Sequence, residues 1–445
     1  MTMTPAPTLD IDPLIDDPAT RIIVCCGSGG VGKTTTAAAL GVRAAERGRK
    51  AVVLTIDPAR RLAQSMGIDS LDNVPRRVDG IKSETGDGEL HAMMLDMKRT
   101  FDEIVEAHAD KERAAAILGN PFYQSLSAGF AGTQEYMAME KLGQLRARDE
   151  WDLIIVDTPP SRSALDFLDA PKRLGSFLDG KFIRLLMAPA KVGGRAGMAF
   201  LNVGMSMMTG TLGKLLGGQF LRDVQTFVTA MDTMFGGFRT RADATYKLLQ
   251  APGTAFLVVA APERDALREA AYFVERLAAE EMPLAGLVLN RVHGSGAARL
   301  SAERALAAAE NLEEARIVDQ GDGKAGVRDS GPTAASPEVP DAVVPGVRSP
   351  EVTDASAPQV PEGAEELIHT TDDVPTTDAL TAGLLRLHAE RMQVLAREQR
   401  TRDRFSALHP EVAVTEVAAL PGDVHDLAGL RAIGDRLAAP GAPLA

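Results

Sequence analysis

Short apolar runs alternate with longer helical stretches along much of the chain. Continuous apolar runs of this kind fit strands that are buried on both faces of a sheet. They occupy residues 21–26, 51–56, 90–95, 153–156, 255–260 and 284–290. Helical patterns fill residues 33–47, 98–118, 134–148 and 263–281. Strands that alternate with helices predict an α/β fold, in which a doubly wound, mostly parallel sheet carries helices on both faces.

Two segments interrupt this alternation. Residues 163–250 show no convincing strand and predict an α-helical insert. Residues 319–377 are rich in Pro, Gly, Ser and Asp and contain almost no aromatic residues, so they cannot bury enough apolar surface to order themselves. The predicted parts are a flexible tail (1–20), a first core part (21–162), the helical insert (163–250), a second core part (251–318), a disordered insertion (319–377), a helix, strand and helix that complete the core (378–437) and a tail (438–445).

Composition narrows the possible functions. The 445 residues include 45% hydrophobic and 24% charged residues, which is ordinary for a globular protein. The net charge of −13 disfavours a broadly basic surface, so we expect no nucleic-acid partner. The two cysteines, Cys25 and Cys26, are neighbours, which excludes a disulfide framework and a cysteine-rich metal site built by this chain alone. No signal peptide and no clean apolar span of about 20 residues is visible, so we expect a cytoplasmic protein.

A glycine-rich turn follows the first predicted strand directly and precedes a predicted helix. It matches the pattern G-x-x-x-x-G-K-[ST] in the run Gly27-Ser28-Gly29-Gly30-Val31-Gly32-Lys33-Thr34. Glycines let backbone N–H groups converge on phosphate oxygens, and the helix N-terminus adds partial positive charge. A lysine here neutralises the β- and γ-phosphates, and the threonine hydroxyl reaches Mg²⁺. The turn therefore predicts a site for ATP and Mg²⁺.

Polar residues close three of the other predicted strands. Asp157 follows residues 153–156, where a carboxylate can hold Mg²⁺ through water beside the phosphate loop. Asp57 follows residues 51–56 and either orients the attacking water or caps the next helix. Asn290 closes residues 284–290 and either reads the edge of adenine or is a simple turn residue.

Together these motifs resemble the ArsA and guided-entry (tail-anchored protein targeting) ATPases, which belong to the deviant Walker A class of P-loop proteins. The resemblance runs from about residue 21 to residue 437, without the low-complexity insertion. It rests on the following matches: the loop from Gly27 to Thr35 with GKGGVGKTT, Asp57-Pro58-Ala59 with the first switch, Asp157-Thr158-Pro159-Pro160 plus Leu165 and Leu168 with the second switch, Asn290 with the adenine-contacting asparagine, and Leu420-Pro421 with the loop whose proline packs near the base. Gly132-Thr133-Gln134-Glu135 matches a Gly/Glu helix start, whose role we leave open.

The resemblance implies an ATPase that uses Mg²⁺ and acts as a dimer. Lys33 and Asp57 would be the catalytic residues, and Thr34 with Asp157 would hold the metal. More narrowly, the sequence is similar to an actinobacterial branch whose members occur as paired paralogous subunits, so both a homodimer and a heterodimer are open. The partner would be a hydrophobic client helix, or a membrane transporter that the ATPase energises, and only such a partner would bring the chain to the membrane. A chromosome- or septum-positioning ATPase shares the loop, but the acidic charge and the lack of a terminal basic helix disfavour it.

The sequence departs from the family at residues that bear on function. Ser28 replaces the signature lysine that crosses the dimer interface to the partner's phosphates. A homodimer would lack this charge at both sites, whereas a lysine-bearing paralogue would restore it. Alternatively Arg162, which stands where the family has glycine, supplies the charge or is simply a surface arginine. Ser163 replaces the second-switch histidine, and no cysteine cluster remains to bind arsenite.

The helical insert contains a large share of the 17 methionines. Methionine is flexible and polarizable, so it adapts to varied apolar partners. By resemblance the insert would form a groove for a client transmembrane helix, and the alternative is an ordinary helical core. The methionines concerned are Met187, Met198, Met205, Met207, Met208, Met231 and Met234.

Overall fold

The computed structural model of the chain describes residues 7–56, 61–83, 86–121, 123–124, 133–159, 237, 240–321 and 376–439, without the side chains of residues 61, 133 and 315–321. Two compact units make up the chain. One contains residues Met1–Ala297 and Val394–Ala445, and the other contains Ala298–Gln393.

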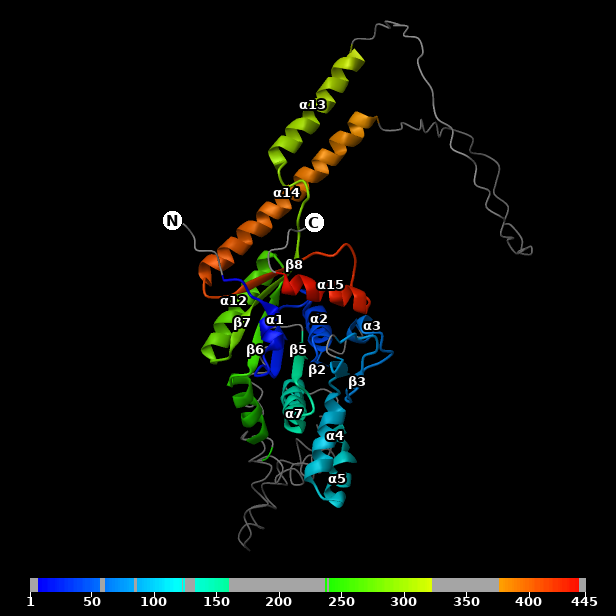
Figure 1. Cartoon of the computed structure of the whole chain (residues 1–445), viewed down its shortest axis with the longest axis vertical. Coiled ribbons are helices and arrows are strands. Elements are labelled where there is room, and N and C mark those ends of the chain that lie inside the picture. Colours follow the sequence, from blue (N-terminus) through cyan, green and yellow to red (C-terminus); the bar gives the residue numbers. More distant parts are fainter. Residues whose placement is uncertain are drawn as a thin grey trace, which may run out of the picture. The chain divides into compact units, whose positions relative to one another are not determined.

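The first unit is built on an eight-stranded sheet in the order β3-β4-β2-β5-β1-β6-β7-β8 (Figure 1). Every neighbouring pair is parallel except β3 and β4, which pair antiparallel. The predicted mostly parallel α/β sheet is therefore confirmed. Its strands are β1 (Ile22–Cys26), β2 (Lys50–Thr55), β3 (Arg76–Arg77), β4 (Glu89–Met94), β5 (Leu153–Asp157), β6 (Thr254–Ala260), β7 (Leu284–Val292) and β8 (Val414–Ala418).

The register of the central strands brings several chain ends to one edge of the sheet. β1 lies between β5 and β6, and every residue of these three strands is buried. In the ladders, Cys25 and Thr55 both stand opposite Asp157. Because parallel strands end at the same edge, the phosphate loop after β1 and the polar residues after β2 and β5 become neighbours.

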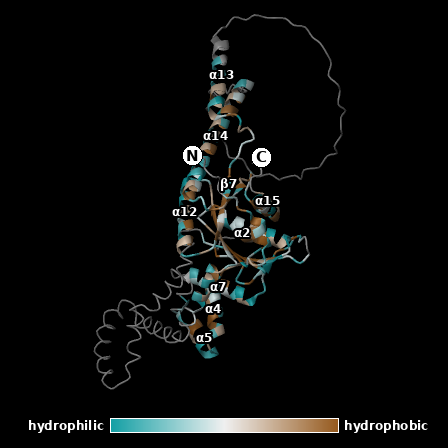
Figure 2. Cartoon of the chain, turned by 60° about the vertical axis from the view of Figure 1, so that its left-hand side comes forward, coloured by the Kyte–Doolittle hydropathy of each residue, from teal (hydrophilic) through white to brown (hydrophobic). Residues whose placement is uncertain are grey.

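Helices cover both faces of the sheet and bury two hydrophobic cores. Neighbouring strand residues point to opposite faces, so Cys25 packs in one core and Cys26 in the other. Helices α1 (Ile11–Asp16), α2 (Lys33–Glu46), α3 (Arg61–Ser65) and α15 (Leu427–Ala438) contribute to the core that contains Cys25. Helices α4 (Met97–His108), α5 (Lys111–Leu118), α7 (Thr133–Arg148) and α12 (Arg264–Ala279) contribute to the core that contains Cys26. Figure 2 shows the hydrophobic colouring of the strands between these layers.

The N-terminal residues differ from the prediction of a flexible tail. Residues 7–20 are described in the structure, and within them Ile11 and Ile15 on α1 are completely buried. Asp10 caps α1 by accepting a hydrogen bond from Asp12 N, and Arg43 of α2 donates to the Asp12 carboxylate over 2.7 Å. The acidic, Pro-rich composition indicated a tail, but Ile11 and Ile15 are four residues apart and therefore share one face of a helix.

The predicted helix over residues 98–118 is in fact two helices. α4 ends at His108 and α5 begins at Lys111, because Asp110 adopts an extended backbone and caps α5 by accepting from Arg113 N. The short elements α3 and β3 were not predicted. None of the described helices is both long and apolar enough to cross a membrane.

The second unit contains the helix predicted after the disordered insertion, which begins within one residue of its expected start, and the helix before the insertion runs three residues past the predicted boundary at residue 318. The second unit contains α13 (Ala302–Gly321) and the first half of α14 (Thr377–Leu408). Arg386 of α14 forms an ion pair with Glu313 of α13 over 2.6 Å. Residues 298–318 therefore belong to this unit and not to the core, and the helix continues into the predicted disordered insertion. The rest of that insertion, and residues 160–236 with most of the helical insert, lie outside the described residues; residues 240–250 form a helix as predicted.

Candidate active site

The turn between β1 and α2 has the backbone of a phosphate loop. Gly30 and Gly32 have φ angles of 76° and 95°, in the left-handed region that side chains disfavour. Gly32 is also the N-cap of α2 and supplies no side chain to its first turn. The N-terminus of a helix presents N–H groups and partial positive charge, so an anion would bind at this end of α2.

Two glycines of this loop permit close packing against neighbouring strands. A Cβ atom at Gly27 would lie 2.1 Å from the Val259 carbonyl oxygen on β6. A Cβ atom at Gly32 would lie 2.2 Å from Nδ2 of Asn290. At Gly27 the contact is with backbone, which leaves no room for a side chain. At Gly32 the nearest atom belongs to a side chain, and the φ of 95° is what disfavours any other residue there.

Lys33 begins α2 and turns back over the loop. Its Nζ donates to the Ser28 carbonyl over 2.7 Å, and the residue is only 5% exposed. This bond holds the ammonium group against the backbone of the loop. Thr35 follows within the first turn of α2.

The carboxylate of Asp157 joins the loop helix to two strands. Its Oδ2 accepts from Thr34 Oγ1 over 2.7 Å and from Thr55 Oγ1 over 2.8 Å, and the residue is completely buried. The next residue, Thr158, donates through its hydroxyl to the Cys25 carbonyl over 2.9 Å. These bonds bring Thr34 and Asp157 together at the edge where β1, β2 and β5 end.

Asn290 reaches the phosphate loop from β7. Its Nδ2 donates to the Val31 carbonyl over 2.8 Å, and the residue is 6% exposed. Arg291 beside it has a φ of 60°, and the pairing with β8 shifts between Leu289 and Val292, so the strand is locally irregular here. The amide is thus fixed against the loop, and its contact with adenine stays a prediction.

The remaining predicted site residues are only partly described. Pro421 is exposed in the segment between β8 and α15, and its role at the base stays a prediction. Asp57 and Arg162 lie outside the described residues, as do Leu165 and Leu168. Ser28 is half-buried at the turn of the loop.

The two cysteine side chains do not take part in this chemistry. Burial raises the pKa of the Cys25 thiol well above its usual value and raises the pKa of Cys26 to about 12. Both thiols are therefore protonated at neutral pH, so neither provides a thiolate that could act as a nucleophile or bind a metal. Their expected function as small apolar strand residues agrees with the packing.

The anion-transporting ATPase family model matches residues 20–317. The chain belongs to this family. The match confirms the resemblance to ArsA and guided-entry ATPases, and the matched range runs from before Gly27 to beyond Asn290.

Several individual proteins with ATPase names are also similar to this chain. An "ATPase GET3" of Podospora anserina is 26% identical over 285 residues, which are 63% of this chain and 75% of the relative. An "ATPase GET3" of Malassezia globosa is 29% identical over 161 residues, which are 36% of this chain and 45% of the relative. "Protein Rv2184c" of Mycobacterium tuberculosis is 31% identical over 166 residues, which are 36% of this chain and 39% of the relative. The chain thus spans less than half of the last two.

Three residues that contact the site were not assigned a role from the sequence. Thr55 lies two residues before Asp57 and Thr158 directly follows Asp157, and a hydroxyl so close to a carboxylate at a strand end is the signal that could have identified them. Gln134 donates from Nε2 to the Ile56 carbonyl over 3.0 Å. Nothing in the local sequence announces this last contact, because it joins residues far apart in the chain.

Proposed function

We propose that the chain is a dimeric ATP-hydrolysing switch that couples the reaction ATP + H₂O → ADP + phosphate to the handling of a hydrophobic client helix. The observation that carries the proposal is the 2.7 Å bond between the Thr34 hydroxyl and the Asp157 carboxylate beside the glycine loop. It pairs the two oxygen groups that hold the metal in a P-loop ATPase, one at the start of the phosphate-binding helix and one at the end of a neighbouring strand.

The donor set fits Mg²⁺. A threonine hydroxyl and a carboxylate are hard oxygen ligands, and Mg²⁺ takes its other ligands from phosphates and water. The described ranges contain no group of three His, Cys, Asp or Glu side chains that would hold a metal by themselves. When bound, Mg²⁺ would supply charge neutralisation at the β- and γ-phosphate oxygens.

Each residue of the site then has a defined task. The loop N–H groups and Lys33 bind the phosphates and stabilise the negative charge that develops on them. Thr34 and Asp157 hold the metal, and Thr55 orients the carboxylate by a second hydrogen bond. Asp57, which follows Ile56 at the end of β2, would orient the attacking water.

The missing loop lysine makes the dimer partner part of the proposal. Ser28 replaces it, so a full complement of positive charge requires a lysine-bearing paralogous subunit or Arg162. A Ser28→Lys variant of the isolated chain should raise the turnover number, with Ser28→Ala as the matched control. If Ser28→Lys leaves turnover at the wild-type level, the cross-subunit charge is not what limits this chain.

The client is tested separately. The full chain, with its paralogous subunit where one exists, should capture a transmembrane-helix peptide, and the captured amount should differ between ATP and ADP. Equal retention of a polar control peptide would count against client handling.

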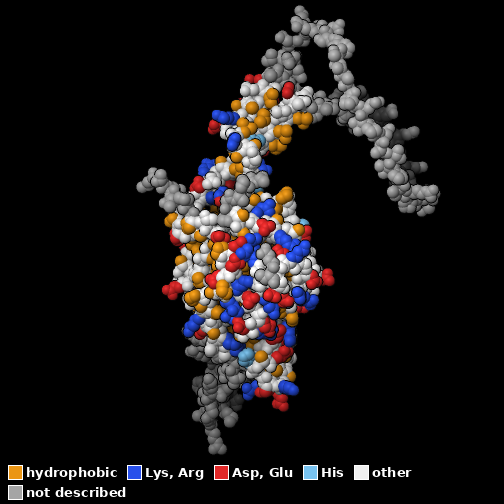
Figure 3. Space-filling model, viewed as in Figure 1, with side chains coloured by type: hydrophobic (Ala, Val, Ile, Leu, Met, Phe, Trp, Pro, Cys, Tyr) orange, Lys and Arg blue, Asp and Glu red, His pale blue; other side chains and the backbone are white. Residues whose placement is uncertain are grey.

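Turnover stimulated by arsenite or antimonite would favour the alternative, an energising subunit of a membrane transporter, although both cysteines are buried and protonated. The visible face of the sheet unit mixes positive and negative side chains (Figure 3), which fits a protein or peptide partner better than nucleic acid.

A further inference from the structure

Arg291 has an unusual backbone conformation for a residue in a strand. In the described part of the chain, three residues other than glycine have a positive φ: Asp149 (51°), Glu281 (54°) and Arg291 (60°). Asp149 directly follows α7 and Glu281 follows the C-cap of α12, and a left-handed residue commonly ends a helix at such positions. Arg291 instead lies within β7, where this conformation is an outlier for a bulky side chain.

The pairing of β7 with β8 shows that Arg291 belongs to a β-bulge. Residues 289–292 of β7 pair with residues 416–418 of β8, so Asn290 and Arg291 together stand opposite Val417 alone. Asn290 is buried and Arg291 is exposed. A bulge of this kind redirects a side chain relative to the regular strand, and here it places the arginine on the surface directly after the buried asparagine.

Contacts on both sides hold this bulge in place. Before it, the Asn290 amide donates to the Val31 carbonyl of the phosphate loop over 2.8 Å. After it, the Val292 carbonyl accepts from Ala419 N over 2.9 Å. A left-handed arginine costs free energy, and such strain persists where the surrounding structure fixes it, most often at functional sites.

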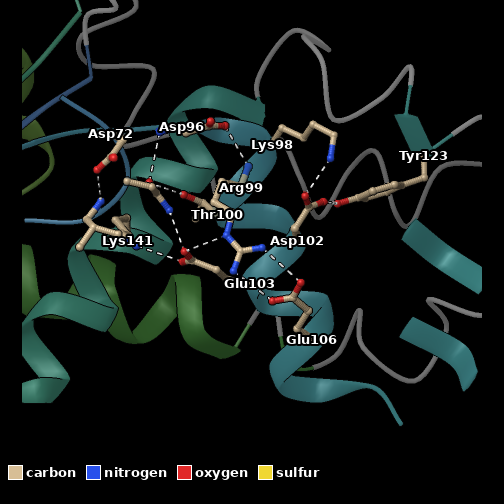
Figure 4. Close-up of polar contacts among 12 residues, drawn as sticks. Asp72, Asp96, Lys98, Arg99, Thr100, Asp102, Glu103, Glu106, Tyr123 and Lys141 are labelled. Atoms are coloured by element: carbon tan, nitrogen blue, oxygen red, sulfur yellow. Dashed lines mark hydrogen bonds and ion pairs between the residues drawn. The ribbon is translucent and has the colours of Figure 1, made fainter. Parts of the chain in front are cut away.

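The guanidinium of Arg291 has no protein partner that would account for this strain. Within the described ranges, no hydrogen bond or ion pair involves its side chain. Arg99 on α4 shows the more usual arrangement, because it pairs with Glu106 over 3.2 Å and with Glu103 over 3.5 Å (Figure 4). The cation of Arg291 is therefore available to a ligand.

The position of Arg291 indicates which ligand this is. The Asn290 amide before it bonds to Val31 and lies against Gly32, so the bulge adjoins the phosphate loop. We infer that Arg291 is a nucleotide-binding residue, whose guanidinium attracts the phosphates of the nucleotide from the β7 side of the loop. The inference rests on the proposed ATPase function and adds to it a cation from this chain.

The test compares ATP binding by Arg291→Gly, Arg291→Lys and Arg99→Ala in this chain. Arg291→Gly should raise the Kd for ATP with Mg²⁺ by about three- to thirtyfold, the range for a partly solvated contact between charged groups. Arg291→Lys keeps the positive charge and should bind ATP more tightly than Arg291→Gly. Arg99→Ala is the matched control, because both partners of Arg99 lie on its own helix, and it should keep the wild-type Kd.

A stability measurement distinguishes ligand binding from a purely structural role. Glycine adopts the left-handed conformation without strain, so nucleotide-free Arg291→Gly should have a higher Tm than wild type. Added ATP with Mg²⁺ should raise the Tm of Arg291→Gly less than that of wild type, because the variant binds the nucleotide more weakly. A Tm of nucleotide-free Arg291→Gly below that of wild type would mean that the arginine stabilises the fold, and would overturn the inference.

Three binding results would also overturn it. They are a wild-type Kd in Arg291→Gly, a loss of affinity that Arg99→Ala reproduces, and equal losses in Arg291→Gly and Arg291→Lys. Lys33→Ala separates this inference from the proposed function. If Lys33→Ala weakens ATP binding and Arg291→Gly does not, only this inference fails, whereas a wild-type chain that does not bind ATP would refute the proposed function itself.

Discussion

Replacing Asn290 with alanine should loosen the phosphate loop from the adjacent strand. The wild-type amide donates to the Val31 carbonyl over 2.8 Å in a buried setting, and its Nδ2 fills the space against Gly32. Removing one partner of a buried hydrogen bond costs about 1–3 kcal/mol. Because 1.4 kcal/mol corresponds to a tenfold change in affinity, Asn290→Ala should weaken ATP binding roughly 5- to 150-fold.

Fluorescence titration with a labelled ATP analogue, followed by competition with ATP and GTP, would measure this loss. Asn73→Ala is the matched control, because Asn73 is equally buried but bonds to Glu103 instead of the loop. This control should lower the unfolding free energy and leave the Kd for ATP unchanged. ATP affinity in Asn290→Ala equal to that of wild type would refute the claim that this amide holds the loop in its binding conformation. A larger loss for ATP than for GTP would support the predicted contact with adenine.

Further predictions concern the loop, a buried thiol and the N-terminal helix. Gly27→Ala should yield unfolded or nucleotide-free protein, because its Cβ would lie 2.1 Å from the Val259 carbonyl oxygen. Gly30→Ala is the control, because its Cβ would meet no atom and the variant should fold with only backbone strain. A soluble Gly27→Ala protein that binds ATP would contradict the loop geometry. Burial raises the pKa of Cys26 in the folded protein from 9.0 to about 12, so the protonated thiol stabilises the fold fully below pH 9 and less as the pH rises above it. The urea midpoint should therefore decrease as the pH is raised above 9, and this decrease should be smaller in Cys26→Ala. Ile15→Ala should lower the unfolding free energy by about 2–5 kcal/mol in urea titrations, and a silent substitution would mean that α1 does not pack as described.

The site could be predicted from the sequence where its residues are fixed by local order. A strand, a glycine run and a lysine at the start of a helix follow one another directly, so the loop from Gly27 to Lys33 was predictable. Asp157 was predictable as its neighbour because parallel strands end at a common edge. Both inferences depend on short sequence separations and on one topological rule.

Contacts between distant segments could not be predicted in the same way. The bond from Gln134 to Ile56 depends on how α7 packs against the sheet, and the match of residues 132–135 to a family helix start did not indicate which strand Gln134 would contact. The packing of α1 was hidden for a related reason. Ile11 and Ile15 are too few to give a helical period, and their burial depends on α2 and on the ion pair of Asp12 with Arg43.

The central claim is that the loop after β1 binds the phosphates of ATP through its backbone and Lys33. The most direct measurement is calorimetric titration of ATP with Mg²⁺ into the chain and its Lys33→Ala variant, with Lys98→Ala as a surface control. Loss of a hydrogen bond to a charged group costs about 1.5–3 kcal/mol, so the Kd should rise at least about tenfold in Lys33→Ala only, and turnover should disappear with it. Wild-type affinity and turnover in Lys33→Ala would contradict the account.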